Sequence, residues 1–395
     1  MQLKRRIHRV DTTRLAQSAA ITMQFSPLEQ LKHRVSVGVP LPFNVRDADE
    51  TLMLARGKVV GNLAQLEALF ERGALVDMAE LLTPMAEVTA ARPEELPKIW
   101  SQCFDRVGQT LMGATELGFA NALEEACTPV LRLIERDPDL AVFQVLRQTG
   151  LAHLDYGLTH AMHAAVTSLL VSQRLGWSDS ESKCAFQAAL TMNLSMLELQ
   201  GTLAAQTTPP TDAQRRAVFD HPSASVALLE QAGITDTRWL AAVAQHHESS
   251  DGKGYPKGLN QPCELASLLH RADIYTTKLS PRIGREAIAA DQAGRAMFMQ
   301  DPGHPMSVAL AKEFGVYPPG CFVKLKSGEI GVVVKRGDTV TTPWVAVLTS
   351  VNGMPLREPL ARNTALREHN IAAVVSEASV PVRLKVEQLM QIKFG

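Results

Sequence analysis

The most informative stretch of the chain is Gln245-His246-His247-Glu248-Ser249-Ser250-Asp251-Gly252-Lys253-Gly254-Tyr255-Pro256. It follows an apolar helical pattern formed by Trp239, Leu240 and Val243. Two histidines at the end of such a helix, followed by a glycine-rich loop, place imidazole rings beside backbone amides. Metal and phosphate sites are often built in this way. An isolated histidine pair is more often a surface feature or a hydrogen-bonded part of a core, so it is the attached loop that favours a functional site.

On either side of this stretch, residues 96–314 read as an almost continuous series of helices. Apolar residues recur there at helical spacing, for example at Val130, Leu131, Leu133 and Ile134. Breaks fall at clusters of Pro, Gly and Asp, and strand patterns are scarce. The sequence therefore predicts a mainly α fold with a helical central domain at residues 96–314.

The first part of the chain, residues 1–95, predicts a small α+β unit. Two short apolar runs, residues 42–46 and 51–55, enclose a polar turn and read as a hairpin. An apolar helical stripe follows Asn62, a residue type that favours helix N-termini, and Gly73 closes the stripe.

The last part, residues 315–395, predicts a small all-β tail. Short β patterns at Cys321–Leu325, Ile330–Val334 and Trp344–Leu348 are separated by turns, one of which carries glycine. A final helix is expected at residues 384–391.

Composition limits the classes of function. The 395 residues include 40 Lys and Arg against 41 Asp and Glu, a formal net charge of −1, and 46% of the residues are hydrophobic. Such a chain is typical of a folded soluble protein. Balanced charge provides no global field for a nucleic acid polymer or an anionic membrane, so an anionic ligand needs a local site.

Cysteine usage and apolar runs predict the compartment. Five cysteines lie far apart without a C-x-x-C pair, which fits reduced thiols in the cytoplasm rather than a disulfide framework or a zinc ribbon. No apolar run approaches the roughly 18 residues of a membrane span. We therefore expect a cytoplasmic protein.

The pattern H-H-E-x-x-D-G-x-G-Y-P at residues 246–256 resembles the signature of the HD-GYP family. This family is a branch of the HD superfamily of metal-dependent phosphohydrolases, and its members linearise the bacterial messenger cyclic di-GMP. The likeness covers roughly residues 133–337. It implies a helical domain in which dispersed histidines and aspartates bind two or three iron or manganese ions. The segment from Tyr317 to Val333 also resembles the β segment often found after HD-GYP cores.

Matched position by position, the resemblance implies two sets of site residues. The implied metal ligands are His160, His221, His246, His247 and Asp273. The implied ligand-binding residues are Asp251, Gly252, Gly254, Tyr255, Arg282 and Arg285. The two arginines keep the spacing of a family segment, R-P-Y-R-K, whose basic residues hold ligand phosphates.

The chain departs from the family at the motif that names the superfamily. Where an active member reads A-A-L-L-H-D-I-G-K, Met192 replaces the histidine, Asn193 the aspartate and Met196 the lysine. A glutamate found in some three-metal members falls on Tyr156. We therefore expect that no intact catalytic set is present.

Charge explains why this departure matters. Two cations that share a site need an anionic oxygen to bridge them, and the neutral amide of Asn193 cannot do this. A thioether at Met192 suits iron or manganese poorly. Two metals about 3.5–4 Å apart are the usual means of activating water for phosphodiester cleavage. His221, His246 and His247 remain as ligands for one iron or manganese ion, with an empty, hydrogen-bonded site as the equally weighted alternative.

Three functional hypotheses follow. The first is a degenerate HD-GYP-like module in cyclic di-GMP signalling that binds the nucleotide or a protein without catalysis. The second is a metal-dependent phosphodiesterase with an atypical single-metal site, in which Arg282 and Arg285 hold the substrate. The third is a ligand-free scaffold. A protein partner is expected in the first and third hypotheses, and the sequence leaves a homodimer open.

Overall fold

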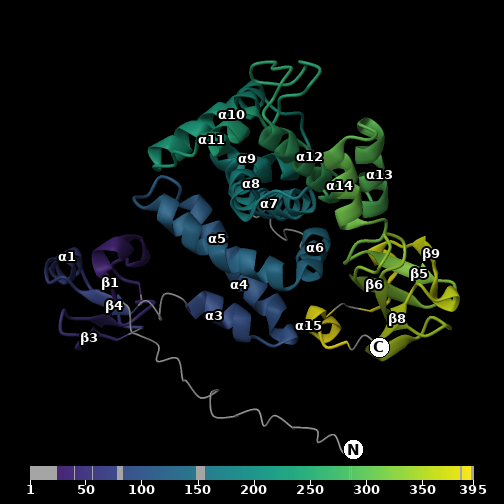
Figure 1. The fold of residues 1–395 in the computed structure, drawn as a ribbon, viewed down its shortest axis with the longest axis horizontal. Coiled ribbons are helices and arrows are strands. Elements are labelled where there is room, and N and C mark those ends of the chain that lie inside the picture. Colours follow the sequence, from purple (N-terminus) through teal and green to yellow (C-terminus); the bar gives the residue numbers. More distant parts are fainter. Residues whose placement is uncertain are drawn as a thin grey trace, which may run out of the picture. The chain divides into compact units, whose positions relative to one another are not determined.

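A computed structural model describes residues 25–39, 41–55, 57–77, 83–147, 156–283, 285, 287–382 and 385–392. The chain forms two compact units, Met1–Thr83 and Pro84–Gly395. The first is a small α+β unit, and the second joins a helical core to a small β-sheet (Figure 1). The fold is thus mainly α, as predicted. None of the described helices is long and apolar enough to cross a membrane.

The N-terminal unit is built on a four-stranded sheet. Its elements are β1 (Phe25–Pro27), β2 (Val45–Arg46), β3 (Leu52–Leu54), α1 (Leu63–Glu71) and β4 (Leu75–Asp77). The strand order is β1-β4-β2-β3, and all pairs are antiparallel. The predicted hairpin is confirmed as β2–β3. The predicted helix is confirmed as α1. The side chain of Asn62 accepts a hydrogen bond from Gln65 N at 2.8 Å and thereby caps the first turn of this helix.

The helical core contains a long series of helices, as predicted. They are α3 (Thr83–Ala90), α4 (Leu96–Met112), α5 (Phe119–Arg136), α6 (Pro138–Arg147), α7 (Tyr156–Arg174), α8 (Asp179–Thr191), α9 (Leu197–Ala205), α10 (Asp212–Gln231), α11 (Thr237–Gln245), α12 (Glu264–Leu279), α13 (Ala290–Gln300) and α14 (Pro305–Phe314). Capping boxes start two of them, with Ser178 before α8 and Thr211 before α10.

Helix α7 is the central helix of this core. It lies in the middle of the bundle in Figure 1, and its residues from Thr159 to Ser172 are all buried. Helices α8, α9, α12 and α14 pack around it. Gly157 permits a close approach to α9, because a β-carbon there would lie only 2.3 Å from the carbonyl oxygen of Leu197. Residues on α7 that are implied as ligands, such as His160, are therefore held inside the bundle.

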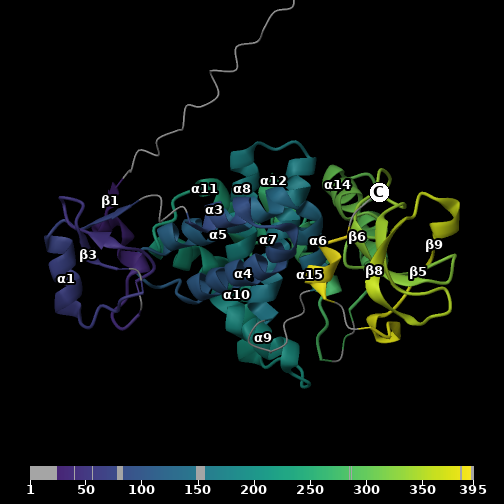
Figure 2. The same ribbon diagram turned by 90° about the horizontal axis from the view of Figure 1, so that it is seen from below.

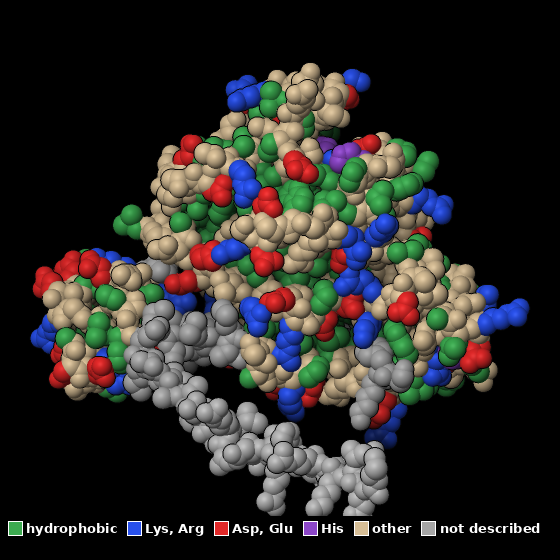
Figure 3. Space-filling model, viewed as in Figure 1, with side chains coloured by type: hydrophobic (Ala, Val, Ile, Leu, Met, Phe, Trp, Pro, Cys, Tyr) green, Lys and Arg blue, Asp and Glu red, His purple; other side chains and the backbone are tan. Residues whose placement is uncertain are grey.

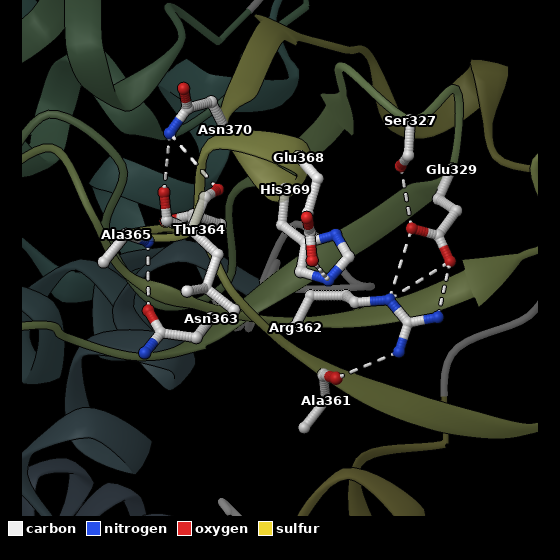
Figure 4. Close-up of polar contacts among 11 residues, drawn as sticks. Ser327, Glu329, Ala361, Arg362, Asn363, Thr364, Ala365, Glu368, His369 and Asn370 are labelled. Atoms are coloured by element: carbon white, nitrogen blue, oxygen red, sulfur yellow. Dashed lines mark hydrogen bonds and ion pairs between the residues drawn. The ribbon is translucent and has the colours of Figure 1, made fainter.

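The C-terminal part forms a five-stranded antiparallel sheet of order β8-β7-β6-β5-β9. Its strands are β5 (Phe322–Leu325), β6 (Ile330–Lys335), β7 (Trp344–Thr349), β8 (Pro355–Asn363) and β9 (Ile371–Val374), followed by the short helix α15 (Val386–Leu389). The three predicted strands are confirmed. Residue 384 of the predicted final helix lies outside the described residues, and among its described residues only α15 is helical. Strands β8 and β9 were not predicted. Buried Glu329 accepts hydrogen bonds from Ser327 and from both Nε and Nη2 of Arg362, and these bonds connect the turn before β6 to β8 (Figure 4).

The sheet packs against the helical core. Phe143 of α6 lies in one hydrophobic cluster with Phe322, Val332 and Leu389, and Figure 2 shows α6 beside the sheet. Arg336 on β6 pairs with Asp139 and with Glu313 at the end of α14. This packing joins both parts into one compact unit.

Candidate metal and nucleotide site

Three histidines form a cluster near the end of α11. His221 lies on α10, and His246 and His247 follow the last residue of α11. One ring nitrogen from each histidine lies within 4.8 Å of the other two. His221 and His246 are buried, and His247 is partly exposed. We call these three residues the histidine cluster. It unites three of the ligands that the resemblance implied.

Hydrogen bonds fix the protonation of two of these rings. Nδ1 of His221 lies 2.6 Å from the carbonyl oxygen of Val218, and Nδ1 of His246 lies 2.7 Å from that of Val243. A carbonyl oxygen can only accept, so both Nδ1 atoms carry a hydrogen. In neutral rings the Nε2 atoms then hold only lone pairs, and they face each other at 3.0 Å. Two lone pairs at this distance repel each other unless a cation lies beside them.

A proton is an unfavourable cation for this position. Burial lowers the pKa of His221. Burial and the two neighbouring histidines hold the pKa of His246 well below its usual value. Burial lowers the pKa of His247 to about 4. Neutral imidazoles are the form that binds metals, and the backbone carbonyls orient the rings as supporting partners usually do. The donor set therefore fits a metal ion.

The other two implied ligands form a separate pair. Nε2 of His160 on α7 donates to Oδ1 of Asp273 on α12 at 2.7 Å. Burial alone raises the pKa of Asp273, but the His160 hydrogen bond and the surrounding histidines outweigh it and hold this pKa below its usual range. The ring of Tyr156 lies parallel to that of His160, with centroids 6.3 Å apart. Asp273 is thus engaged by His160.

The positions that the resemblance assigns to the superfamily motif lie at the turn between α8 and α9, residues 192–196, which we call the α8–α9 turn. Met192 is fully buried at 0% exposure and belongs to the hydrophobic core, and Asn193 is 2% exposed. Among the described residues, Oδ1 of Asn193 has no hydrogen-bond partner. Glu198, the nearest acid beyond the turn, is exposed.

The glycine loop, residues 248–259, is held by backbone hydrogen bonds. Buried Glu248 accepts from the backbone nitrogens of Lys257 at 2.7 Å and Leu259 at 2.8 Å. A β-carbon at Gly254 would lie 2.5 Å from the α-carbon of Glu248, so only glycine fits. Gly252 has φ +70°, in the left-handed region. Glu248 therefore shapes the loop.

The side chains of the non-glycine residues implied in ligand binding differ in exposure and in their contacts. These residues are Asp251, Tyr255, Arg282 and Arg285. Asp251 is exposed and accepts hydrogen bonds from Ser249 and Lys253 within the loop. Tyr255 stacks on His247 with ring centroids 4.5 Å apart. Nε of half-buried Arg282 donates to the hydroxyl of Tyr156 at 2.7 Å, and Arg285 is exposed and donates to a carbonyl at the end of α12.

Comparisons with known proteins agree with this architecture. The family model described as HD domain matches residues 148–301. Over 203 residues, 50% of this chain and 49% of the relative, the protein is 28% identical to cyclic di-GMP phosphodiesterase PA4108 of Pseudomonas aeruginosa. Over 141 residues, 35% of this chain and 30% of the relative, it is 28% identical to 3'3'-cGAMP-specific phosphodiesterase 3 of Vibrio cholerae. The chain thus matches about half or less of the length of these curated relatives.

The chain is an HD-GYP-like protein. Among solved structures, Bd1817, an HDG"Y"P protein from Bdellovibrio bacteriovorus, superposes with a TM-score of 0.47 at 15% identity, covering 73% of this chain and 97% of that chain.

The HD-GYP-like core also contains a cleft of about 990 Å³ beside the glycine loop. His247, His270, Arg271 and His304 contribute to its walls. Figure 3 shows histidine side chains at the surface of the helical core. Sequence reasoning did not single out His270, whose Nδ1 donates to the carbonyl oxygen of His246 at 2.8 Å. No sequence signal marks this contact, because it joins residues 24 apart across two elements.

Proposed function

We propose that this HD-GYP-like protein binds one iron or manganese ion on the histidine cluster and recognises cyclic di-GMP or a closely related cyclic dinucleotide without efficient hydrolysis. The observation that carries this proposal is the arrangement of His221 and His246. Their Nε2 lone pairs face each other at 3.0 Å while both Nδ1 atoms donate to carbonyls. A single cation relieves this repulsion.

The same residues argue against a second metal. Asp273, which the resemblance implies as a ligand, is hydrogen-bonded to His160. Asn193 offers a neutral amide where a bridging carboxylate is needed to offset the repulsion between two cations. We therefore infer that the two-metal activation of water used by such phosphodiesterases is missing.

The remaining residues suit a phosphodiester ligand. When bound, the metal supplies a Lewis acid that polarises a phosphate oxygen. Tyr156 fixes Arg282 through Nε, and among the described residues the two terminal guanidinium nitrogens of Arg282 have no hydrogen-bond partner. A guanidinium fork of this kind suits two phosphate oxygens. Arg285 is the weaker candidate, because its Nη2 donates to Thr277 O at 2.6 Å.

A single-metal phosphodiesterase is the second candidate. It is favoured by the ligand count, since three imidazoles leave coordination positions open for water and substrate, as in catalytic metal sites. The two candidates differ in turnover.

The decisive experiment measures metal content, binding and hydrolysis on the same preparation. The full chain is reconstituted anaerobically with ferrous iron or manganese. Its metal-to-protein ratio is determined, and cyclic di-GMP is added in a calorimeter and in a hydrolysis assay. The proposal expects one metal per chain, measurable binding and no turnover. His246→Ala removes one histidine of the cluster. As the matched control, His369→Ala removes an imidazole from the short 3-10 turn between β8 and β9.

Each outcome separates the hypotheses. Turnover that disappears in His246→Ala favours the single-metal phosphodiesterase and contradicts our first proposal. Metal binding without nucleotide binding contradicts the ligand assignment. If the folded protein binds neither metal nor nucleotide, both proposals are contradicted. The hypothesis of a ligand-free scaffold, which acts by contact with a protein partner, then remains.

A further inference from the structure

Three aromatic rings form a continuous stack that runs outward from the histidine cluster. The ring of Tyr255 lies on that of His247 at 4.5 Å and 17°, and the ring of Phe219 lies on that of Tyr255 at 5.5 Å and 21°. These distances and angles are those of offset-stacked aromatic pairs. Phe219 lies on α10, two residues before the cluster ligand His221. The stack therefore joins the proposed metal site to the surface of the protein.

Phe219 is exposed although it belongs to this stack. It retains 48% of its surface in solvent, while His247 at the inner end is far more buried. Leaving so much of a phenyl ring in water forgoes much of the hydrophobic stabilisation that its burial would supply. Phe219 also lies outside every motif that the family resemblance marks.

We propose that Phe219 is a base-stacking residue, which receives a purine of the bound cyclic dinucleotide on its exposed surface. This inference rests on the proposed function and names the part of the ligand that the proposed function leaves unassigned. A purine continues the stack as a fourth aromatic layer, while the metal and Arg282 engage phosphate. Base–aromatic stacking is worth about 1–3 kcal/mol per base. A purine buries more apolar area on the ring than a pyrimidine does, so we expect the purine to bind more tightly.

A purine fits this surface better than an apolar side chain of a protein partner. The stack presents a flat aromatic plane with nearly parallel rings, and Phe219 is connected through Tyr255 to a residue that contacts the proposed metal. A flat base complements such a plane over its whole area.

The test compares two variants of Phe219, one without an aromatic ring and one with a different aromatic ring. Phe219→Leu keeps an apolar side chain and removes the ring, and Phe219→Trp keeps a larger ring. Phe298→Leu is the matched control, because Phe298 is also an exposed phenylalanine, at 39%, on α13 outside the cleft and the stack. Metal-loaded full-length proteins are titrated with cyclic di-GMP and with the pyrimidine analogue cyclic di-UMP in a calorimeter.

We expect Phe219→Leu to raise the Kd for cyclic di-GMP at least ten-fold, which corresponds to about 1.4 kcal/mol. Phe219→Trp and Phe298→Leu are expected to stay within about three-fold of the wild type. In Phe219→Trp, guanine stacking is expected to quench the new indole fluorescence in proportion to saturation. The wild type is expected to bind cyclic di-UMP more weakly than cyclic di-GMP, and Phe219→Leu is expected to narrow this difference.

Failure of the inference is distinguishable from failure of the proposed function. Equal affinity of the wild type and Phe219→Leu for cyclic di-GMP overturns the stacking role while the proposed function stands. Loss of binding in Phe298→Leu as large as in Phe219→Leu also overturns it, because the effect is then not specific to the stack. A wild type that binds neither dinucleotide overturns the proposed function, and the stacking role with it.

Discussion

The glycine loop and the α8–α9 turn both lie against the histidine cluster, but they differ in what remains of the family pattern. Tyr255 N donates to the carbonyl oxygen of His247 at 3.1 Å, and Ser195 Oγ donates to that of His221 at 3.1 Å. The loop keeps its whole signature. In the turn, Met192, Asn193 and Met196 stand at the positions where the resemblance implies the histidine, aspartate and lysine of the superfamily motif.

The difference follows from what each region does for the fold. In the loop, Glu248 and Gly254 are required by backbone hydrogen bonds and close packing, so they stay necessary even without chemistry. In the turn, Met192 packs in the hydrophobic core, and Asn193 Oδ1 has no hydrogen-bond partner among the described residues. Retention of a motif therefore reports structural need as well as function.

The largest expected effect is the loss of metal from the histidine cluster, which lies beside the glycine loop. His246→Ala removes one of the two facing Nε2 atoms, and the remaining two ligands hold a metal poorly. We expect the metal-to-protein ratio to fall from about one to near zero, measured by elemental analysis after anaerobic reconstitution. His369→Ala should keep the wild-type ratio. An unchanged ratio in folded His246→Ala would place the metal elsewhere.

The second prediction concerns the α8–α9 turn, where three substitutions restore the residues that the resemblance implies. The triple variant Met192→His, Asn193→Asp and Met196→Lys supplies an imidazole, a bridging carboxylate and a cation. We expect the ratio to rise from about one metal per chain to two and hydrolysis of cyclic di-GMP to appear. Met196→Lys alone is the control and should stay at one. A folded triple variant that binds a single metal would contradict the idea that the turn alone sets the metal count.

A third prediction concerns His163, a buried histidine on α7 whose two ring nitrogens have no hydrogen-bond partner among the described residues. Burial, with a smaller contribution from His160, lowers the pKa of His163 to about 3. The unfolded chain therefore binds a proton more readily than the folded one between about pH 6.5 and 3. We expect the free energy of unfolding of the metal-free protein to fall as the pH drops through this range.

The variant His163→Leu tests this cause. It removes two unsatisfied polar atoms from the core, so it should raise stability at pH 5 and flatten the pH dependence in urea unfolding. His304→Leu, at a more exposed histidine that accepts a hydrogen bond from Met306 N, is the control. If the unfolding free energy of His163→Leu depends on pH as steeply as that of the wild type, groups other than His163 cause the dependence.

The smallest expected effect lies in the glycine loop. Glu248→Gln keeps the shape of the side chain but replaces two charge-assisted hydrogen bonds to backbone nitrogens with at most one neutral bond. We expect a loss of about 1.5–3 kcal/mol in unfolding free energy and faster amide exchange at Lys257 and Leu259. The exposed Glu198→Gln should change neither. Wild-type exchange rates in Glu248→Gln would show that the carboxylate does not hold the loop.

Much of the fold was predictable because the deciding signals are local. Asn62 marks the start of α1, and Gly328 marks the turn before β6. Strand β8 was missed because its sequence, Pro355–Asn363, alternates weakly and carries charges, as edge strands often do. The helix predicted at 384–391 is reduced to α15, since its apolar residues serve packing against the sheet.

For the site, the sequence predicted which residues to consider but not how they pair. The grouping of His221 with His246 and His247 followed from the family spacing. The contact between Tyr156 and Arg282 joins residues 126 positions apart, and neither residue type signals it. The stack of Phe219 on Tyr255 was missed for the same reason. Long-range side-chain pairs of this kind depend on the packing of α7, α10 and α12, which no local pattern encodes.

The burial of Met192 also bears on how the turn tolerates substitution. Single changes are each expected to lower stability: a histidine at 192 would place an imidazole in an apolar core, and an aspartate at 193 would place an uncompensated carboxylate in a buried turn. A metal brought in by the combined changes would compensate both costs. The packing of one methionine thus makes the turn respond to pairs of substitutions differently from the sum of the single ones.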